Sequence, residues 1–264
     1  MSETTMRTRV LGEALPIAFE DRGRGRPYLI LHGGAGPASM ARFAAALAGT
    51  GRAIVPTHPG FAGEPRPDWF RRIDELALAY LALLDRLDLA DVIVIGNSLG
   101  GWIAAEMALR ASPRVAGIVL LNPVGIDTGS PDKTIFDPMS VPPAERVARS
   151  FHDPARFAVL PTTPEALAAM AANQQTLRVY GSAGGFMHDP TLRARLAAVT
   201  APALVIWGES DRIVDAAYGR LFATSMPGAR FAPVAEAGHF PHIERSEQVQ
   251  ALIADFVATG PGGP

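Results

Sequence analysis

The chain has 264 residues, of which 48% are apolar, so it is long enough to bury a large hydrophobic core. Its formal net charge of −2 provides no positive field for gathering nucleic acid or anionic lipid. It contains no cysteine, which excludes disulfides, thiolate nucleophiles and sulfur-ligated metals.

The start of the chain shows no targeting pattern. Residues 1–6 are polar and lack the apolar stretch of a signal peptide, and the longest apolar runs of the chain are strand-sized. We therefore expect a cytoplasmic protein that acts on a small-molecule substrate, with no nucleic-acid or membrane partner. No pattern in the sequence indicates its oligomeric state.

Short apolar runs alternate with helical patterns along most of the chain. This alternation is typical of crossover units in a mostly parallel sheet. An N-terminal pair at 7–11 and 16–20 adds an antiparallel edge. The other runs are hydrophobic without interruption, as strands covered on both faces are. They lie at 28–31, 53–55, 92–95, Val115–Leu121 and 203–207.

Three helices are predicted between and after these strands. Residues 73–87 carry leucines at helical spacing, and 101–111 is rich in small residues, which suit a helix packed tightly on a sheet. Apolar positions between 249 and 256 mark one face of a last helix. We expect the tail 260–264 to be disordered.

The segment 124–190 interrupts the alternation. It contains two helical patterns, at 143–151 and 164–178, and the second is preceded by Thr163, which suits a helix N-cap. We find no convincing strand in it and expect flexibility at 181–185. The prediction is a core formed by residues 1–123 and 191–264, with 124–190 inserted as a helical cap over the C-terminal edge of the sheet.

The motif Gly-Asn-Ser-Leu-Gly at 96–100 follows the expected strand 92–95 and opens a helix. So sharp a turn strains the backbone of its central residue and leaves room only for small residues two positions to either side. It exposes the Ser98 hydroxyl at a helix N terminus, where free N–H groups bind negative charge. This context predicts Ser98 as a nucleophile; the alternative is a plain glycine turn or a phosphate-binding loop.

A second glycine-rich stretch, His-Gly-Gly-Ala-Gly-Pro at 32–37, follows the first of the continuous strands. Its glycines let the backbone turn N–H groups toward the space above Ser98, where acyl transfer develops an oxyanion. We expect the N–H groups of Leu99 and Gly34 to form the oxyanion hole. A shift of one residue would put Ala35 in place of Gly34.

A serine hydroxyl needs a base to take its proton, and the chain has six histidines. His239 lies in Ala-Gly-His-Phe-Pro at 237–241, a loop between a late strand pattern and the last helix, and it returns over the edge that carries Ser98. His242 is the rival, but its position suits a surface or helix-start residue. His32 is interpreted as structural.

The third member of a triad is a carboxylate that follows a strand and precedes the histidine. Asp211 follows the last of the continuous strands and lies far enough beyond it to curl toward His239. Glu209 lies closer to the strand end, and the uncharged Asn122 cannot replace the acid. The order Ser98, Asp211, His239 is the one typical of a single triad fold.

With these motifs in this order the sequence resembles the α/β-hydrolase superfamily over nearly its whole length. The resemblance extends from H-G-G-x-G at His32 through G-N-S-L-G-G at Gly96 to G-H-F-P at Gly238. It implies an α/β fold, namely an eight-stranded, mostly parallel sheet with helices on both faces. It also implies a helical cap inserted after the strand that ends near Asn122.

The resemblance leaves several subfamilies to weigh. Epoxide hydrolases and dehalogenases use an aspartate nucleophile where this chain has Ser98. The Gly-Asn-Ser context is similar to hydrolases that cleave carbon–carbon bonds in ring-fission products, which usually carry a cap arginine and a tryptophan after the base. Here Phe240 follows His239, and Asn173 stands near the expected arginine, with Arg178 close by. C–C hydrolysis, a cofactor-independent haloperoxidase or perhydrolase, and a binding-only protein are therefore the alternatives.

The sequence thus predicts a serine esterase for small to medium, mostly apolar carboxylic esters. His239 deprotonates Ser98, an acyl-enzyme forms, and Asp211 holds the histidine, so no metal or organic cofactor is needed. Apolar residues of the inserted segment and its surroundings are candidates for a pocket, although each is more simply interpreted as core. These are Trp102, Met139, Phe151, Met170, Phe186, Met187 and Phe240.

Overall fold

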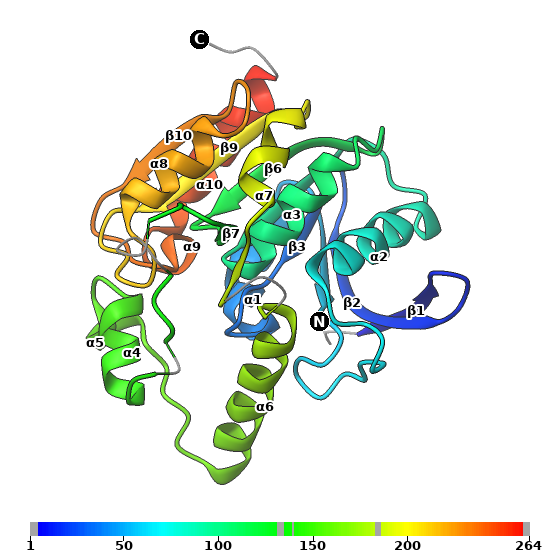
Figure 1. Cartoon of the computed structure of the whole chain (residues 1–264). Coiled ribbons are helices and arrows are strands. Elements are labelled where there is room, and N and C mark those ends of the chain that lie inside the picture. The colour runs from blue at the N-terminus through cyan, green and yellow to red at the C-terminus, as the bar shows by residue number, and fades with distance from the viewer. Residues whose placement is uncertain (1–4, 131–134, 139, 183–185, 261–264) are drawn as a thin grey trace.

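The computed structural model describes residues 5–130, 135–138, 140–182 and 186–260 (Figure 1). The main strands are β1 (Met6–Val10), β2 (Leu15–Gly23), β3 (Pro27–Leu31), β4 (Arg52–Thr57), β5 (Val92–Asn97), β6 (Val115–Leu121), β9 (Ala203–Gly208) and β10 (Arg230–Val234). They form one eight-stranded sheet in the order β1-β2-β4-β3-β5-β6-β9-β10. β2 runs antiparallel to β1 and β4, and all the other pairs are parallel, which confirms the predicted fold class.

Helices cover both faces of this sheet. α2 (Ile73–Arg86), α3 (Leu99–Leu109) and α8 (Ala216–Thr224) contribute to the hydrophobic cluster on one face. α1 (Ala41–Leu47) and α10 (Ser246–Thr259) contribute to the cluster on the other face. Alternate residues of each central strand enter opposite clusters, which is why these strands are hydrophobic throughout their length.

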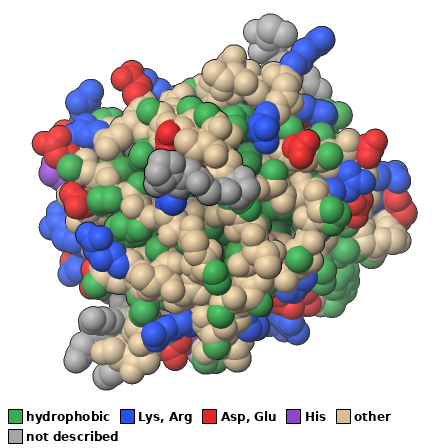
Figure 2. Space-filling view, turned by 90° about the horizontal axis from the view of Figure 1, so that it is seen from above, with side chains coloured by type: hydrophobic (Ala, Val, Ile, Leu, Met, Phe, Trp, Pro, Cys, Tyr) green, Lys and Arg blue, Asp and Glu red, His purple; other side chains and the backbone are tan. Residues whose placement is uncertain are grey.

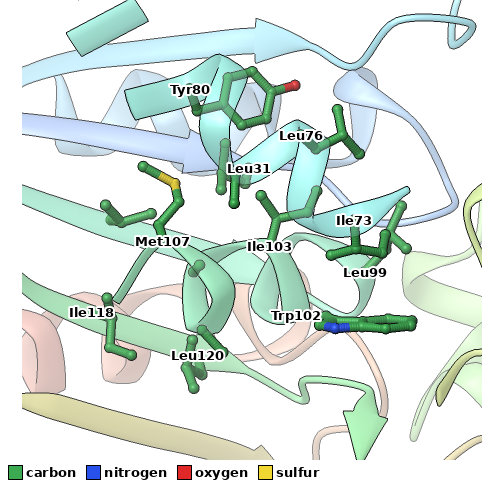
Figure 3. Packing of buried hydrophobic residues seen from close by; sticks show 14 of the residues in the cluster. Leu31, Ile73, Leu76, Tyr80, Leu99, Trp102, Ile103, Met107, Ile118 and Leu120 are labelled. Atoms are coloured by element: carbon green, nitrogen blue, oxygen red, sulfur yellow. The ribbon is translucent and has the colours of Figure 1, made fainter. Parts of the chain in front are cut away.

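Helix α3 is packed on all sides, and this fixes the turn that precedes it. Figure 3 shows Leu99, Ile103 and Met107 of α3 among side chains of α2 and the sheet. Every residue from Leu99 to Ala108 is buried. This burial explains why the sequence of the helix is rich in small residues. Each large apolar side chain buried in this way contributes about 1.5–3 kcal/mol.

The described residues of 124–190, the segment predicted to be a cap, connect β6 to β9 and lie at the C-terminal edge of the sheet (Figure 1). Its helices are α4 (Pro143–Ser150), α5 (Pro154–Phe157) and α6 (Pro164–Tyr180). Thr163 is the N-cap of α6 as predicted, because its side chain accepts the Ala166 N–H at 3.2 Å. The expectation that the segment has no strand is wrong, since the two-residue strands β7 (Gly125–Ile126) and β8 (His188–Asp189) pair in parallel.

Short elements complete the chain. The remaining helices are η1 (Pro37–Met40), α7 (Leu192–Arg195), η2 (Leu196–Ala198) and α9 (Pro241–Glu244). Within the described ranges, every helix is too short or too polar to span a bilayer. Figure 2 shows basic and acidic side chains interspersed on one face of the molecule. Most of the segment 181–185, predicted to be flexible, and of the tail 260–264, predicted to be disordered, lies outside the described residues, namely 183–185 and 261–264.

Candidate active site

Ser98 occupies the turn between β5 and α3. Its backbone has φ 54° and ψ −115°, a strained conformation for a residue with a side chain. The glycines on either side are required sterically: a Cβ on Gly96 would overlap the Gly100 carbonyl, and one on Gly100 would overlap the carbonyl of Leu31. The turn therefore holds the Ser98 side chain at the first turn of α3, where it is 8% exposed.

Asp211 and His239 meet above the ends of their strands. His239 Nδ1 lies 2.7 Å from Asp211 Oδ2, and because a carboxylate only accepts, the imidazole donates this hydrogen bond. The other carboxylate oxygen accepts the N–H groups of Ile213 at 2.8 Å and Val214 at 3.1 Å. These bonds fix the carboxylate and leave His239 Nε2 as the basic nitrogen.

The sequence analysis missed a residue that contacts this pair. Asn122 donates from Nδ2 to Asp211 Oδ2 at 2.7 Å, and its Oδ1 accepts the Gly208 N–H at 3.1 Å. From the sequence, Asn122 is an uncharged residue that cannot replace the acid. In the structure it is fully buried and supports the acid instead.

The loop of His239 is attached to the serine turn. Asn97 donates from Nδ2 to the His239 carbonyl at 3.0 Å and to the Leu121 carbonyl at 3.0 Å. Among the described residues, no hydrogen bond joins the Ser98 hydroxyl to His239. Catalytic hydrogen bonds of this kind are often long in a ligand-free site and shorten when substrate binds.

The glycine-rich loop at 32–37 approaches Ser98 from the other side. A Cβ on Gly33 would lie 3.0 Å from Ser98 Cβ, so the loop backbone runs directly beside the turn that holds Ser98. In the part of the chain that the structure describes, the N–H groups of Gly34 and Leu99 donate no hydrogen bond. A Cβ on Gly34 would lie 2.6 Å from Leu177 Cδ2, so α6 covers this loop, a contact the sequence analysis missed.

Two buried histidines, His32 and His58, pack against each other at the start of this loop. The rings of His32 and His58 stack with centroids 3.7 Å apart, and the His58 N–H donates to His32 Nε2 at 3.0 Å. His58 also hydrogen-bonds with Tyr80. Burial lowers the pKa of His32 to about 4 and that of His58 well below its ordinary value. Both rings are neutral at pH 7 and act as supports, consistent with the interpretation of His32 as structural.

The rival groups lie elsewhere. His242 is at the start of α9 as expected, but it is 1% exposed, so a surface position for it was wrong. Burial lowers its pKa to about 3, outweighing the backbone of Ser39, which raises it; His239 lowers it further. Glu209 is exposed to solvent, and its carboxylate makes no contact with His239 within the described residues.

The predicted pocket residues fall into three groups. Phe240 contacts the His239 ring edge-on, with centroids 5.4 Å apart, and lies 5.1 Å from the Phe151 ring. Met170 is partly exposed on α6, and Met139 lies outside the described residues. The remaining three join the hydrophobic cluster around α3: Trp102, Phe186 and Met187.

Two surface cavities lie away from Ser98. The larger, about 630 Å³, is lined by residues of α7 and α8, such as Arg193 and Leu221, and by Asp127. The smaller, about 340 Å³, has several charged side chains in its lining, among them Asp153, Glu236 and Arg245. In the described ranges, no cluster of three or more histidine, aspartate or glutamate side chains could hold a metal ion.

Comparison with known proteins covers almost the whole chain. A family model described as the alpha/beta hydrolase family matches residues 28–252. A 2-hydroxy-6-oxononadienedioate/2-hydroxy-6-oxononatrienedioate hydrolase from Paraburkholderia phymatum is 28% identical over 93% of this chain and 92% of its own length. A 2-hydroxy-6-oxo-6-phenylhexa-2,4-dienoate hydrolase from Burkholderia cepacia is 24% identical over 92% of each chain.

Solved structures share the fold. A meta-cleavage product hydrolase (CumD) is 20% identical, with a TM-score of 0.77 over 97% of this chain and 98% of its own. An esterase from Thermogutta terrifontis is 23% identical, with a TM-score of 0.77 over 98% of this chain and all of its own. At such identities the likeness shows the architecture alone.

Proposed function

The chain belongs to the α/β-hydrolase family, and from this premise we propose that it is a serine hydrolase of small to medium, apolar carboxylic esters. The proposal rests on the buried hydrogen bond between His239 and Asp211, together with the strained turn that holds Ser98. A serine hydroxyl becomes a nucleophile only beside a base of this kind, and the carboxylate keeps the base in the tautomer it needs.

The proposed reaction has two halves. His239 Nε2 takes the Ser98 proton as the serine oxygen attacks the ester carbonyl, and it then protonates the departing alcohol. Water activated by the same nitrogen releases the acid from the acyl-enzyme. The N–H groups of Leu99 and Gly34 are the candidate donors to the oxyanion, and each such donor lowers the barrier by about 3–4 kcal/mol.

The surroundings of the triad support an uncharged substrate. Leu177 lies over Gly34, the Phe240 ring contacts the His239 ring, and the Phe151 ring packs on Phe240. These apolar groups exclude water and favour a hydrophobic acyl or alcohol group.

The residues nearest the expected substrate arginine are already engaged. Arg178 pairs with Asp137 at 3.3 Å and is half-exposed. Asn173 accepts the Ala62 N–H at 2.9 Å and so helps to attach α6 to the core. Both side chains already bind groups of the protein. Neither position therefore offers a substrate carboxylate an unpaired positive charge, which favours a neutral ester.

Hydrolysis of a carbon–carbon bond is the second candidate. It is favoured by the printed functions of the relatives from Paraburkholderia phymatum and Burkholderia cepacia, which match this chain nearly end to end. The same triad would serve it, because in both reactions a nucleophile attacks a carbonyl carbon before the adjacent bond breaks. The two candidates therefore differ in the substrate that the site accepts and share the groups that react.

One set of assays tests the class and then the substrate. A fluorophosphonate probe should label the protein at Ser98, and Ser98→Ala should abolish both labelling and turnover of p-nitrophenyl butyrate. Turnover that survives in Ser98→Ala would refute the serine mechanism, and absence of labelling would indicate a binding-only protein. Faster turnover of a dienoate ring-fission product than of any p-nitrophenyl ester would replace the esterase with the C–C hydrolase.

A further inference from the structure

Glu244 is a buried carboxylate that the proposed chemistry does not use. It lies at the end of α9, five residues after His239, and is 5% exposed. Its Oε2 accepts the Gly238 N–H at 2.6 Å, and its Oε1 accepts the N–H groups of His152 at 3.0 Å and Asp153 at 2.9 Å. One side chain thus joins the loop of the base to the connection between α4 and α5.

The end of α4 is bonded to the same loop through its backbone. The Ser150 carbonyl accepts the N–H of His239 itself at 2.7 Å. The Arg149 carbonyl accepts the N–H of Arg212, the residue after the acid, at 3.1 Å. A Cβ on Gly238 would lie 2.9 Å from Phe151 Cα, so the two chain segments are in van der Waals contact.

These bonds explain how a carboxylate can be buried at this point. Removing a carboxylate from water is costly unless hydrogen bonds replace its hydration, and three backbone N–H groups do so here. Both oxygens accept, so an amide cannot reproduce the arrangement: its NH₂ group would face a backbone N–H on one side or the other. The site requires a carboxylate and not merely a side chain of that shape.

We propose that Glu244 is a positioning residue for His239, fixing the α4–α5 pair to the loop of the base so that the imidazole stands at a set distance from Ser98. The inserted helices on this side are then a fixed wall of the active site. The bonds between these helices and the loop set the position of His239, and the helices themselves cover it. This inference rests on the proposed serine mechanism.

The test compares Glu244→Gln with Glu247→Gln. Glu247 is exposed in the first turn of α10, so its variant controls for loss of a glutamate from the same region. Glu244→Gln should reduce kcat for p-nitrophenyl butyrate by about tenfold to a hundredfold with KM within about twofold, the size expected when a catalytic group is misplaced by about 1 Å. The rate of fluorophosphonate labelling should fall by the same factor. Glu247→Gln should leave both unchanged.

Hydrogen exchange separates positioning from general damage. In folded Glu244→Gln the amides of 150–153 and 238–239 should exchange faster, while those of the central strands keep their protection. Wild-type kcat and labelling in the folded variant would overturn the inference. So would a loss of activity that merely follows the fraction of unfolded protein.

A second variant keeps the test available if Glu244→Gln does not fold. Glu244→Asp retains the charge but is shorter by one methylene, so it should lower the labelling rate less, again without raising KM; an unaltered rate in this variant would also overturn the inference. Failure of the serine mechanism itself is recognised separately, because Ser98→Ala and His239→Ala would then keep their activity.

Discussion

Replacing Asn122 by aspartate changes a single atom beside the proposed acid. The Oδ1 that accepts the Gly208 N–H is retained, but the Nδ2 that donates to Asp211 Oδ2 at 2.7 Å becomes an oxygen. The backbone at 122 has φ 44°, which asparagine and aspartate both tolerate, so the substitution adds little backbone strain. The variant therefore isolates one hydrogen bond.

The magnitude follows from the proton that the new pair must share. Two carboxylates this close repel by about 5 kcal/mol at an effective dielectric constant of 20, so one of them binds a proton at neutral pH. Holding that proton at pH 7 costs about 1.4 kcal/mol for each pH unit above the ordinary carboxyl pKa of about 4. We expect Asn122→Asp to lower the free energy of unfolding by about 4 kcal/mol at pH 7.

The sign of the pH dependence is the distinctive part. The pKa of the shared pair is raised in the folded protein above its value in the unfolded chain. The variant protein therefore keeps its full stability below about pH 4. That stability is lost as the pH rises from there through the pKa of the pair in the folded protein. At acidic pH the free energy of unfolding of the variant should approach that of the wild type. At higher pH it should fall below the wild-type value by about 1.4 kcal/mol per pH unit.

Urea unfolding between pH 4.5 and 8 measures this slope directly. Asn173→Asp is the matched control, because Asn173 is partly exposed and its side chain accepts a backbone N–H from Ala62. Its stability relative to the wild type should be nearly constant over the same range. A pH-independent loss in Asn122→Asp would refute the reasoning, since it would mean that residue 122 does not face Asp211.

Three further substitutions have definite outcomes. His242→Phe should raise the free energy of unfolding at pH 5 by about 2 kcal/mol and less at pH 8 in urea titrations, because a buried ring with a folded pKa of about 3 destabilises the fold as pH falls below about 6.5. Leu177→Ala removes the side chain over Gly34 and should raise kcat/KM for p-nitrophenyl octanoate relative to the acetate. Gly96→Ala should yield no correctly folded enzyme by circular dichroism, because its methyl group would overlap the Gly100 carbonyl.

Features encoded within a few consecutive residues were accessible from the sequence. β6 occupies the predicted residues Val115–Leu121, because a continuous apolar run bounded by turn residues is characteristic of a strand covered on both faces. The predicted helix at 73–87 is observed as Ile73–Arg86 for a similar reason, its leucines marking one buried face. α1 was missed because its seven residues are too few to establish a helical period.

The supports of the candidate site could not be found in this way. Asn122 and Asp211 are 89 residues apart, and Glu244 and His152 are 92 apart. Neither Asn122 nor Glu244 belongs to a motif with a spacing that chemistry requires, so only the fold reveals their partners. The burial of His242 could not be predicted for the same reason. Its neighbour Phe43 belongs to α1, which lies near the other end of the chain.

The proposed reacting groups and the residues proposed to select the substrate come from different parts of the chain. Ser98, Asp211 and His239 follow core strands, whereas Leu177 and Arg178 come from α6 of the inserted segment. An ester and a ring-fission product make the same demand on the first set, a nucleophile and a base, so the triad cannot distinguish them. The distinction rests on whether the segment offers a cation to the substrate, and here Arg178 is already paired with an aspartate of that segment. A substrate carboxylate would have to displace that aspartate before it could bind, whereas a neutral ester would not, and this difference is the physical reason for placing the esterase first.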